Sequence, residues 1–235
     1  MHLVFVGAHP DDETYASGTI AKHVANGGEA TIVVATRGGK GHWKIPSEEL
    51  CRLRTGEMEN AAKLLGADLV WLDYEDASVP VGDELRDTIV NVYRRLKPDI
   101  VITFHPLVWR DDHRRVGLAA SDATLKASLP LYRTNHPYHR PEPDVYFFGE
   151  PMIPIEPDTY VDVTEMMEMK HKAFISHASQ WTSWEIDGPS EPDHVENVWT
   201  RFRERFAANG TKCGVRYAEA FIGREKTRRI WPILT

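Results

Sequence analysis

The 235-residue chain is poor in cysteine, in long apolar runs and in surplus positive charge. Its two cysteines, Cys51 and Cys213, have neither metal-site nor disulfide-framework spacing, which favours a reducing compartment. No apolar run approaches the ~20 residues of a membrane span, and no signal-like segment precedes the first predicted strand. A net charge of -7 excludes a broad surface for nucleic acid or anionic membrane. We therefore expect a cytoplasmic protein.

Internal repeats and low-complexity tracts are also absent from the sequence. No Gly-x-Gly-x-x-Gly follows the first predicted strand, which argues against a dinucleotide-binding domain. Hydrophobic residues make up 42% of the chain and charged residues 27%, as in ordinary globular proteins. A chain of this length can bury most of its surface in one core, so we expect a single domain over residues 1–235.

Strand and helix patterns alternate through the first two thirds of the chain. Short, continuously apolar runs, typical of strands buried on both faces, occur at residues 3–8, 30–35, 69–72 and 100–104. Helical patterns follow the first three of them, at about residues 15–26, 47–65 and 83–96. This order predicts an α/β fold, with a Rossmann-like, largely parallel sheet flanked by helices on both faces.

Beyond Pro130 the pattern loosens into a C-terminal α+β extension. Strands are expected at residues 145–148 and 159–163, and helices at about 164–177 and 194–208. Ser47, Asp83 and Thr164 are expected to cap the helices that they precede.

Polar residues follow the ends of the predicted strands. They are His9, Arg37, Asp73 to Asp76 and His105. Because ligands bind beyond the carboxyl ends of the strands in such sheets, we expect these residues to gather at one edge.

The pentapeptide His9-Pro10-Asp11-Asp12-Glu13 places one imidazole and three carboxylates directly after the first apolar run. Charges crowded at the end of a buried strand are costly unless something offsets them, and a divalent metal is the simplest candidate. The alternative is a polar loop in which Asp11 or Asp12 caps the following helix.

A catalytic zinc usually takes three protein ligands and leaves the fourth position for water. His9 and Asp12 can provide two ligands from one turn. The third should come from another strand end, where Asp111-Asp112-His113 opens the helix after the fourth strand.

The remaining carboxylates need other roles. Asp11 lies close enough to accept a proton from a water whose pKa zinc lowers towards ~7. Glu13 and Asp112 would orient the ligands. The resulting chemistry is hydrolysis of an unreactive carbonyl bond.

Seven segments of the chain together resemble the LmbE/PIG-L family of zinc-dependent de-N-acetylases, which act mainly on N-acetylglucosamine groups. These segments are Ala8 to Glu13, Thr36-Arg37-Gly38, the helix from Arg54 to Gly66, Lys97-Pro98-Asp99, Asp112-His113, His177-Ala178-Ser179-Gln180 and Arg216 to Phe221. The likeness covers nearly the whole chain and is greatest to bacterial deacetylases related to bacillithiol synthesis.

The resemblance implies zinc ligation by His9, Asp12 and His113, with Asp11 as general base. It also suggests that Arg54 and Asp76 contact substrate hydroxyls or a phosphate, although a solvated helix position and a turn residue are the alternatives. An open site of His and carboxylate accepts other divalent ions such as Fe2+. The implied partner is a small amino-sugar substrate, and a homo-oligomer stays open.

One position departs from the family pattern. The family commonly has a histidine three residues before the third ligand, thought to protonate the leaving amine or brace the oxyanion, where this chain has Arg110. Arginine stays charged, so Arg110 could hold an oxyanion or an anionic substrate group but could not act as the acid. Either Asp11 shuttles the proton, or His42, His105 or His139 replaces the missing histidine.

Two further sets of residues have open roles. His177 falls on an apolar helix face, which fits a core histidine as well as a site residue. Four tryptophans in predicted loops around the same edge could stack on a sugar ring or simply pack: Trp43, Trp109, Trp181 and Trp184.

The sequence therefore predicts a zinc-dependent hydrolase that removes the acetyl group from an N-acetylated amino sugar. The alternatives are a metal-dependent hydrolase of a larger amide or a phosphoester, and a non-catalytic sugar-binding protein on the same fold. Retention of the complete set His9, Asp11, Asp12 and His113 argues against the last alternative.

Overall fold

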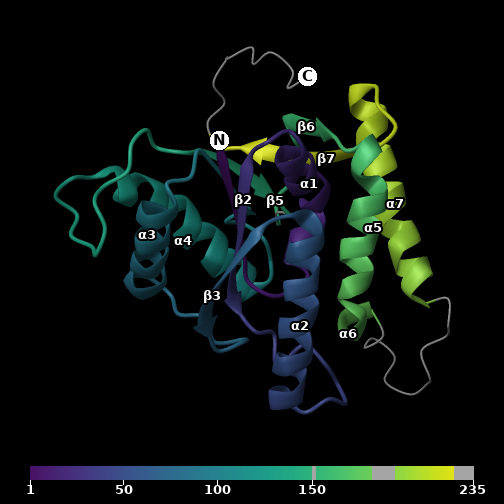
Figure 1. Cartoon of the computed structure of the whole chain (residues 1–235), viewed down its shortest axis with the longest axis horizontal. Coiled ribbons are helices and arrows are strands. Elements are labelled where there is room, and N and C mark those ends of the chain that lie inside the picture. The colour runs from purple at the N-terminus through teal and green to yellow at the C-terminus, as the bar shows by residue number, and fades with distance from the viewer. Residues whose placement is uncertain (150–151, 182–193, 225–235) are drawn as a thin grey trace.

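A seven-stranded sheet forms the centre of the computed structural model, which describes residues 1–149, 152–181 and 194–224 (Figure 1). The strand order is β3-β2-β1-β4-β5-β7-β6. The parallel strands are β1 (His2–Gly7), β2 (Glu29–Thr36), β3 (Asp68–Tyr74), β4 (Ile100–Phe104) and β5 (Asp144–Phe148). Strand β7 (Ala218–Gly223) pairs antiparallel with β5, and β6 (Thr159–Asp162) pairs antiparallel with β7. The predicted largely parallel α/β sheet is confirmed.

Helices cover both faces of the sheet (Figure 1). One layer contains α1 (Ser17–Ala25), α2 (Ser47–Leu65), α5 (Met167–Ser176) and α7 (His194–Cys213). The other layer contains α3 (Asp83–Leu96) and α4 (Asp111–Ser128). Shorter helical segments are η1 (Asp12–Tyr15), η2 (Thr164–Met166) and α6 (Ala178–Trp181). None of the helices in the described ranges has the length and apolar character needed to cross a membrane.

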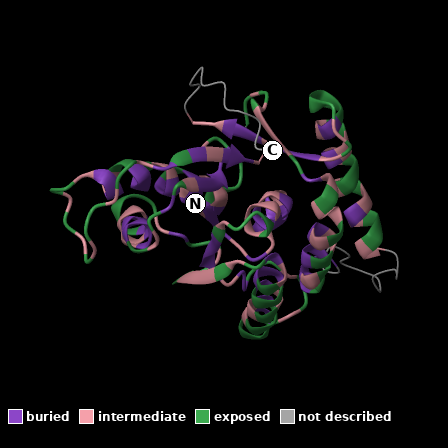
Figure 2. Ribbon diagram, turned by 45° about the horizontal axis from the view of Figure 1, so that its top comes forward, coloured by how far each residue is buried: buried purple, intermediate pink, exposed green. Residues whose placement is uncertain are grey.

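The central position of β1 in the sheet explains why the sequence of this strand is continuously apolar. It pairs with β2 on one side and β4 on the other, and the helix layers cover both of its faces. Both sets of alternating side chains are therefore buried, so neither can be polar. Figure 2 shows the buried residues along the strands and on the inward sides of the helices.

The three predicted caps are wrong. Ser47 and Asp83 are the first residues of α2 and α3, and neither helix has a side-chain cap hydrogen bond. Pro46 and Gly82 instead hold the cap positions, with backbone angles outside the helical region. Thr164 opens η2 rather than α5.

The first predicted helix is divided in two. Residues 12–15 form η1, and α1 begins only at Ser17, because Ala16 leaves the helical conformation with φ -126°. Asp11 occupies the N-cap position of η1, but neither its side chain nor that of Asp12 makes a cap hydrogen bond to η1 or α1. The charged turn is thus separated from α1 and stays at the sheet edge.

The C-terminal part contains a longer α7 than predicted and the strand β7, which the sequence reading missed. Glu219 of β7 is buried and accepts hydrogen bonds from the backbone N–H groups of Gly18 and Thr19 at the start of α1. Buried Lys170 of α5 pairs with Glu219 and also donates to the carbonyl of Thr14 in η1. The C-terminal strand therefore helps to fix the turn that carries the candidate metal ligands.

Candidate active site

The carboxyl ends of the central strands meet around the turn after β1, as the topology predicts. His9 and Asp12 come from this turn, Asp76 from the loop after β3, and His113 from the first turn of α4. Arg37 lies further out, where its guanidinium donates to Asp73 at 2.8 Å and links the ends of β2 and β3.

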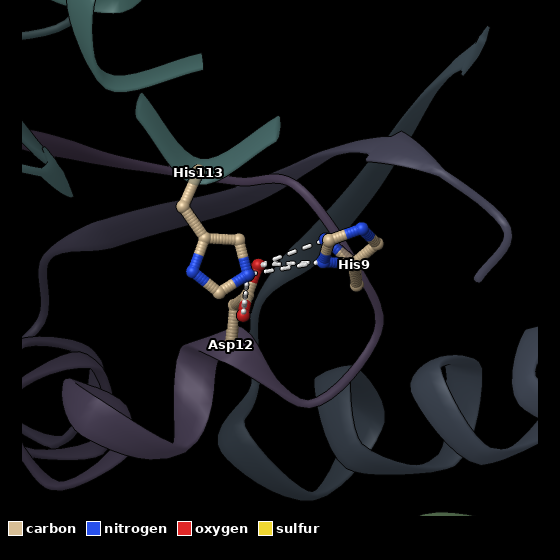
Figure 3. Close-up of side chains that lie close together, drawn as sticks. All are labelled: His9, Asp12 and His113. Atoms are coloured by element: carbon tan, nitrogen blue, oxygen red, sulfur yellow. Dashed lines mark hydrogen bonds and ion pairs between the residues drawn. The ribbon is translucent and has the colours of Figure 1, made fainter. Parts of the chain in front are cut away.

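Three potential ligands point toward one another in Figure 3. His9 Nδ1 lies 3.1 Å from His113 Nε2, and Asp12 Oδ1 lies 3.5 Å from the same His113 nitrogen. His9 Nδ1 and Asp12 Oδ2 are 3.9 Å apart. The potential ligand atoms all lie within 4.8 Å of one another, so these residues form a group that could hold a metal ion.

Asp12 is aimed at this point by its own backbone. Its Oδ2 accepts hydrogen bonds from the N–H groups of Ala8 and His9, each at 2.8 Å. This leaves Oδ1 as the oxygen nearer to His113. The turn thus uses one oxygen of the carboxylate for its own structure and presents the other.

The pKa values of the two histidines are shifted in opposite directions. Burial lowers the pKa of His9, but hydrogen bonds to Asp112 and Asp76 outweigh it and raise the pKa to about 10. Burial and the neighbouring His9 charge lower the pKa of His113 to about 3. The carboxylates thus favour the charged form of His9, and its charge in turn favours the neutral form of His113, which is the form in which an imidazole binds a metal.

Asp76 and Asp112 hold His9 from its other side. Asp76 Oδ1 lies 3.0 Å from His9 Nε2 and Asp112 Oδ2 lies 3.4 Å from it. Carboxylates in these positions keep a proton on Nε2 and leave Nδ1 to face His113 and Asp12. His9, Asp76 and Asp112 also form a second group close enough to hold a cation.

Asp76, for which a substrate contact is suggested, lies between the loop after β2 and His9. Its Oδ2 accepts a hydrogen bond from the Lys40 N–H at 2.7 Å, while Oδ1 faces His9. Burial tends to raise the pKa of Asp76, but the hydrogen bonds from His9 and the Lys40 backbone lower it to about 2. Asp76 is therefore a charged group that joins the loop after β2 to the candidate ligand.

Asp76→Asn is expected to weaken metal binding by roughly 10- to 100-fold, because the variant lacks the charge that orients His9. Competition with a chromogenic chelator measures the affinity for zinc. Glu75→Gln is the matched control, since Glu75 lies in the same loop but pairs with the exposed Lys40 side chain. Equal zinc affinity in the Asp76 variant and the wild type would refute the orienting role.

Arg54 of α2 is buried, with 3% exposure, and contacts the predicted base rather than open space. Its guanidinium donates to the Pro10 carbonyl, to Asp11 Oδ1 at 3.1 Å and to the Gly38 carbonyl at 2.9 Å. A Cβ on Gly38 would lie 2.2 Å from this guanidinium, and Gly38 has a φ of +66°. The Thr36-Arg37-Gly38 segment thus requires glycine so that Arg54 can reach Asp11.

The environment of Asp11 suits a base. Burial raises the pKa of its carboxyl to about 6, and the positive charge of Arg54 opposes the rise. A carboxylate with this pKa is ionised at neutral pH and still accepts a proton readily.

Arg110 lies at the rim, just before α4, with its guanidinium 5.3 Å from the ring of Trp109. After burial and the charge of His9, the charge of Arg110 is a further cause that lowers the pKa of His113. Trp109 and Trp43 are 68% and 69% exposed, which leaves their rings accessible to a ligand. Trp181 packs on Phe174 in the core, and Trp184 lies outside the described residues.

The three candidate replacements for the missing histidine differ in position. The prediction for His139 is wrong, because its Nε2 bonds to the carbonyl of Pro98, which precedes β4 and lies at the opposite edge of the sheet. His42 Nδ1 accepts the N–H groups of Lys44 and Ile45 and so shapes its own loop. His105 follows β4 at the correct edge, with Nδ1 bound to the N–H of Leu107.

Sequence reasoning left His177 open, and the structure buries it behind the turn. Its Nε2 lies 2.7 Å from Glu13 Oε1, and Glu13 Oε2 accepts the Asp11 N–H at 3.2 Å. Asp112 accepts the Ala77 N–H at 2.8 Å and so also braces the loop after β3. The only sequence signal for the contact between His177 and Glu13 was the resemblance of the His177-Ala178-Ser179-Gln180 segment to the family.

Known proteins resemble this chain in sequence and in fold. The PIG-L family model, described as GlcNAc-PI de-N-acetylase, matches residues 4–124. Diacetylchitobiose deacetylase of Thermococcus kodakarensis is 28% identical over 92% of this chain and 80% of its own length. A probable N-acetyl-alpha-D-glucosaminyl L-malate deacetylase 2 of Bacillus anthracis is 30% identical over 87% of this chain and 93% of its own.

Another relative has a different activity. The 4-oxalmesaconate hydratase of Pseudomonas putida is 28% identical over 77% of this chain and 74% of its own length.

Among solved structures, N,N'-diacetylchitobiose deacetylase from Pyrococcus horikoshii superposes with a TM-score of 0.82 at 28% identity, covering 99% of this chain and 87% of that one. The chain belongs to the PIG-L family, as its sequence motifs predict.

Proposed function

We propose that this single-domain protein is a metal-dependent hydrolase that removes the acetyl group from an N-acetylated amino sugar. The observation that carries the proposal is the donor set of His9, Asp12 and His113 beside a buried carboxylate, Asp11, with a pKa of about 6. Two relatives named as deacetylases of diacetylchitobiose and of an N-acetylglucosaminyl malate support the substrate class.

Zinc is the metal that we assign to His9, Asp12 and His113, because two imidazoles and one carboxylate match its catalytic donor sets. Bound there, zinc supplies a water of lowered pKa and polarises the amide carbonyl. Fe2+ is the alternative ion that the same donors suit.

The residues of the chain then divide the remaining work. Asp11 accepts a proton from the attacking water and returns it to the leaving nitrogen as the amide bond breaks. Arg54 keeps Asp11 in place through its carboxylate and the preceding carbonyl. Arg110 holds negative charge on the substrate at the rim and takes no part in proton transfer, since its guanidinium does not deprotonate.

The ionised form of Asp11 is the active base, so kcat/KM should fall as pH drops through the pKa of this carboxyl. We expect this acid limb at or below about 6, since a bound cation favours the carboxylate. Arg54→Gln removes a charge that lowers the pKa, so the limb should move up by roughly one pH unit. Arg54→Lys keeps the charge and is the control in pH–rate profiles. Coincident limbs in the two variants would contradict the coupling.

A second candidate function is hydration of an unsaturated carboxylate. The exposed Arg110 beside Trp109 favours it, because a fixed guanidinium binds carboxylates well, and one relative is named as a hydratase. The same activated water would add across a carbon–carbon double bond without releasing acetate.

Zinc-loaded protein should be assayed on diacetylchitobiose and on malate-linked, inositol-linked and glycopeptide forms of N-acetylglucosamine. Acetate and free amine are measured together, with the chelated protein and Asp11→Asn as controls. Loss of ultraviolet absorbance of an unsaturated dicarboxylate reports hydration, and phosphate release from simple phosphoesters reports the other hydrolase class. Absence of acetate release from all the N-acetylated sugars would overturn the proposed function.

A further inference from the structure

Asp11 has an unusual backbone for a residue other than glycine. Its φ is +105° and its ψ is -20°, in the region that side-chain-bearing L residues rarely adopt. Such a conformation persists only where neighbouring contacts hold it, and such residues cluster at functional sites. The question is therefore which contacts hold Asp11.

Two side chains grip the peptide groups on either side of Asp11. Glu13 Oε2 accepts the Asp11 N–H at 3.2 Å, and Arg54 donates to the Pro10 carbonyl and to Asp11 Oδ1. Glu13 is almost fully buried, so its direction depends on the partner of its other oxygen. That partner is His177, whose Nε2 donates to Glu13 Oε1 at 2.7 Å.

His177 is itself held firmly at the end of α5. Its N–H donates to the Phe174 carbonyl, and its own carbonyl accepts the N–H of Gln180. Two residues further on, Ser179 donates hydrogen bonds from its N–H and its hydroxyl to the carboxylate of Glu57 in α2. The backbone of His177 is therefore fixed on both sides along the chain.

The His177 ring makes one side-chain hydrogen bond and leaves its other nitrogen unused. It is completely buried, and among the described residues Nδ1 has no hydrogen-bond partner. A histidine retained only for core packing normally has both nitrogens paired, because an unpaired buried polar atom is costly. The hydrogen bond to Glu13 is therefore the contact that distinguishes histidine from an apolar residue at this position.

We propose that His177 is a positioning residue for Asp11: it orients Glu13, and Glu13 holds the Asp11 N–H that keeps this backbone in its positive-φ conformation. The inference rests on the proposed function, in which Asp11 is the base. It gives the late His177-Ala178-Ser179-Gln180 segment a role at a turn 164 residues earlier in the chain.

The test compares His177→Leu with His177→Gln. Leucine fills most of the space without a donor, whereas the glutamine amide can still donate to Glu13. In His177→Leu, kcat should fall on the order of 100-fold with KM nearly unchanged, because the base is misplaced while the substrate surface is intact. His177→Gln should recover most of this loss. His171→Leu is the matched control and should behave as the wild type. His171 of α5 is partly exposed, pairs with Glu196 and forms no hydrogen bond with Glu13 or Asp11 in the described part of the chain, and leucine can still pack on Trp199.

Three further measurements separate positioning from a structural role. Zinc content should stay close to that of the wild type in both His177 variants. The melting temperature should fall in His177→Leu, because Glu13 Oε1 is left buried without a donor, and should recover in His177→Gln, so turnover is compared at a temperature where all variants are folded. A double variant with Glu13→Gln should be no slower than the slower single variant, because both act through one contact. Additive losses in the double variant would overturn the proposal.

Amide hydrogen exchange tests the inference without any turnover. The Asp11 N–H should exchange at least ~10-fold faster in His177→Leu than in the wild type, and at nearly the wild-type rate in His177→Gln. Unchanged exchange at Asp11 in His177→Leu would overturn the positioning role even if the protein is an active deacetylase. Absence of acetate release by the wild type would instead refute the proposed function, and the exchange result would still decide how Asp11 is held.

Discussion

Asp11→Asn should lower kcat at least ~100-fold while the protein retains its full equivalent of zinc. Asparagine has the shape of aspartate and can still accept the hydrogen bond from Arg54, but its amide cannot take a proton from water. It also tolerates positive φ better than most residues, so the turn should keep its conformation. Steady-state kinetics and metal analysis on the same sample measure both quantities.

Asp111→Asn is the matched control for this change. Asp111 lies in the first turn of α4, is exposed and pairs with Arg115 on the same helix. Its loss should change kcat by no more than about twofold, as is usual for a surface substitution. Near-normal turnover of Asp11→Asn with full zinc would show that Asp11 is not the base.

The sheet and its functional edge could be predicted because both depend on simple regularities. Four continuously apolar runs mark four strands. Strands β1, β2 and β4 are buried on both faces as expected, whereas β3 lies at the edge of the sheet and is only partly buried. Parallel strands place their carboxyl ends together. That rule alone brings the turn after β1 and the start of α4 to one place. The close approach of His9 to His113 follows from topology more than from any local pattern.

The direction of individual side chains could not be predicted in the same way. Asp76 follows β3 as expected, but Asp73 and Ala77 both have positive φ, and this loop conformation accompanies a carboxylate that faces His9. Arg54 was expected to contact substrate, and in the structure its guanidinium also bonds to Asp11 and to the Gly38 carbonyl, because Gly38 leaves space for it. Residue order along the chain contains no signal for either orientation.

Contacts between distant segments were also beyond sequence reasoning. Glu219 reaches Gly18 across 201 residues, and no periodicity links the two positions. The motif around Glu219 was recognised, but its strand was not, because a short run of alanine, phenylalanine and isoleucine does not separate strand from loop. Such pairings depend on the assembled tertiary structure.

The carboxylates of the first turn share one design principle. Asp12 binds two backbone N–H groups with one oxygen and presents the other toward His113. Glu13 similarly binds the Asp11 N–H with one oxygen and His177 with the other. Each carboxylate thereby shapes the backbone and orients a functional group, which explains how adjacent acids with such different roles fit in one short turn.

His113→Phe should lower the affinity for zinc at least ~100-fold and abolish turnover, because it removes one of three protein ligands from a site that leaves the fourth position to water. Phenylalanine keeps the packing of the position, since the His113 ring stacks on Phe104 with centroids 3.9 Å apart and an angle of 16° between planes. The variant therefore separates the loss of a donor atom from the loss of a packed ring. Isothermal titration with zinc gives the affinity directly.

Thermal unfolding provides an independent measure of the same event, because an ion that binds only the native state stabilises it by about 2.7 kcal/mol at a free concentration of 100 Kd. Zinc should raise the melting temperature of the wild type and leave that of His113→Phe unchanged. His139→Phe makes the same substitution at the opposite edge of the sheet, near Pro98, and should retain the zinc-dependent rise. If His113→Phe were stabilised by zinc as strongly as the wild type, the alternative group of His9, Asp76 and Asp112 would be the metal site instead.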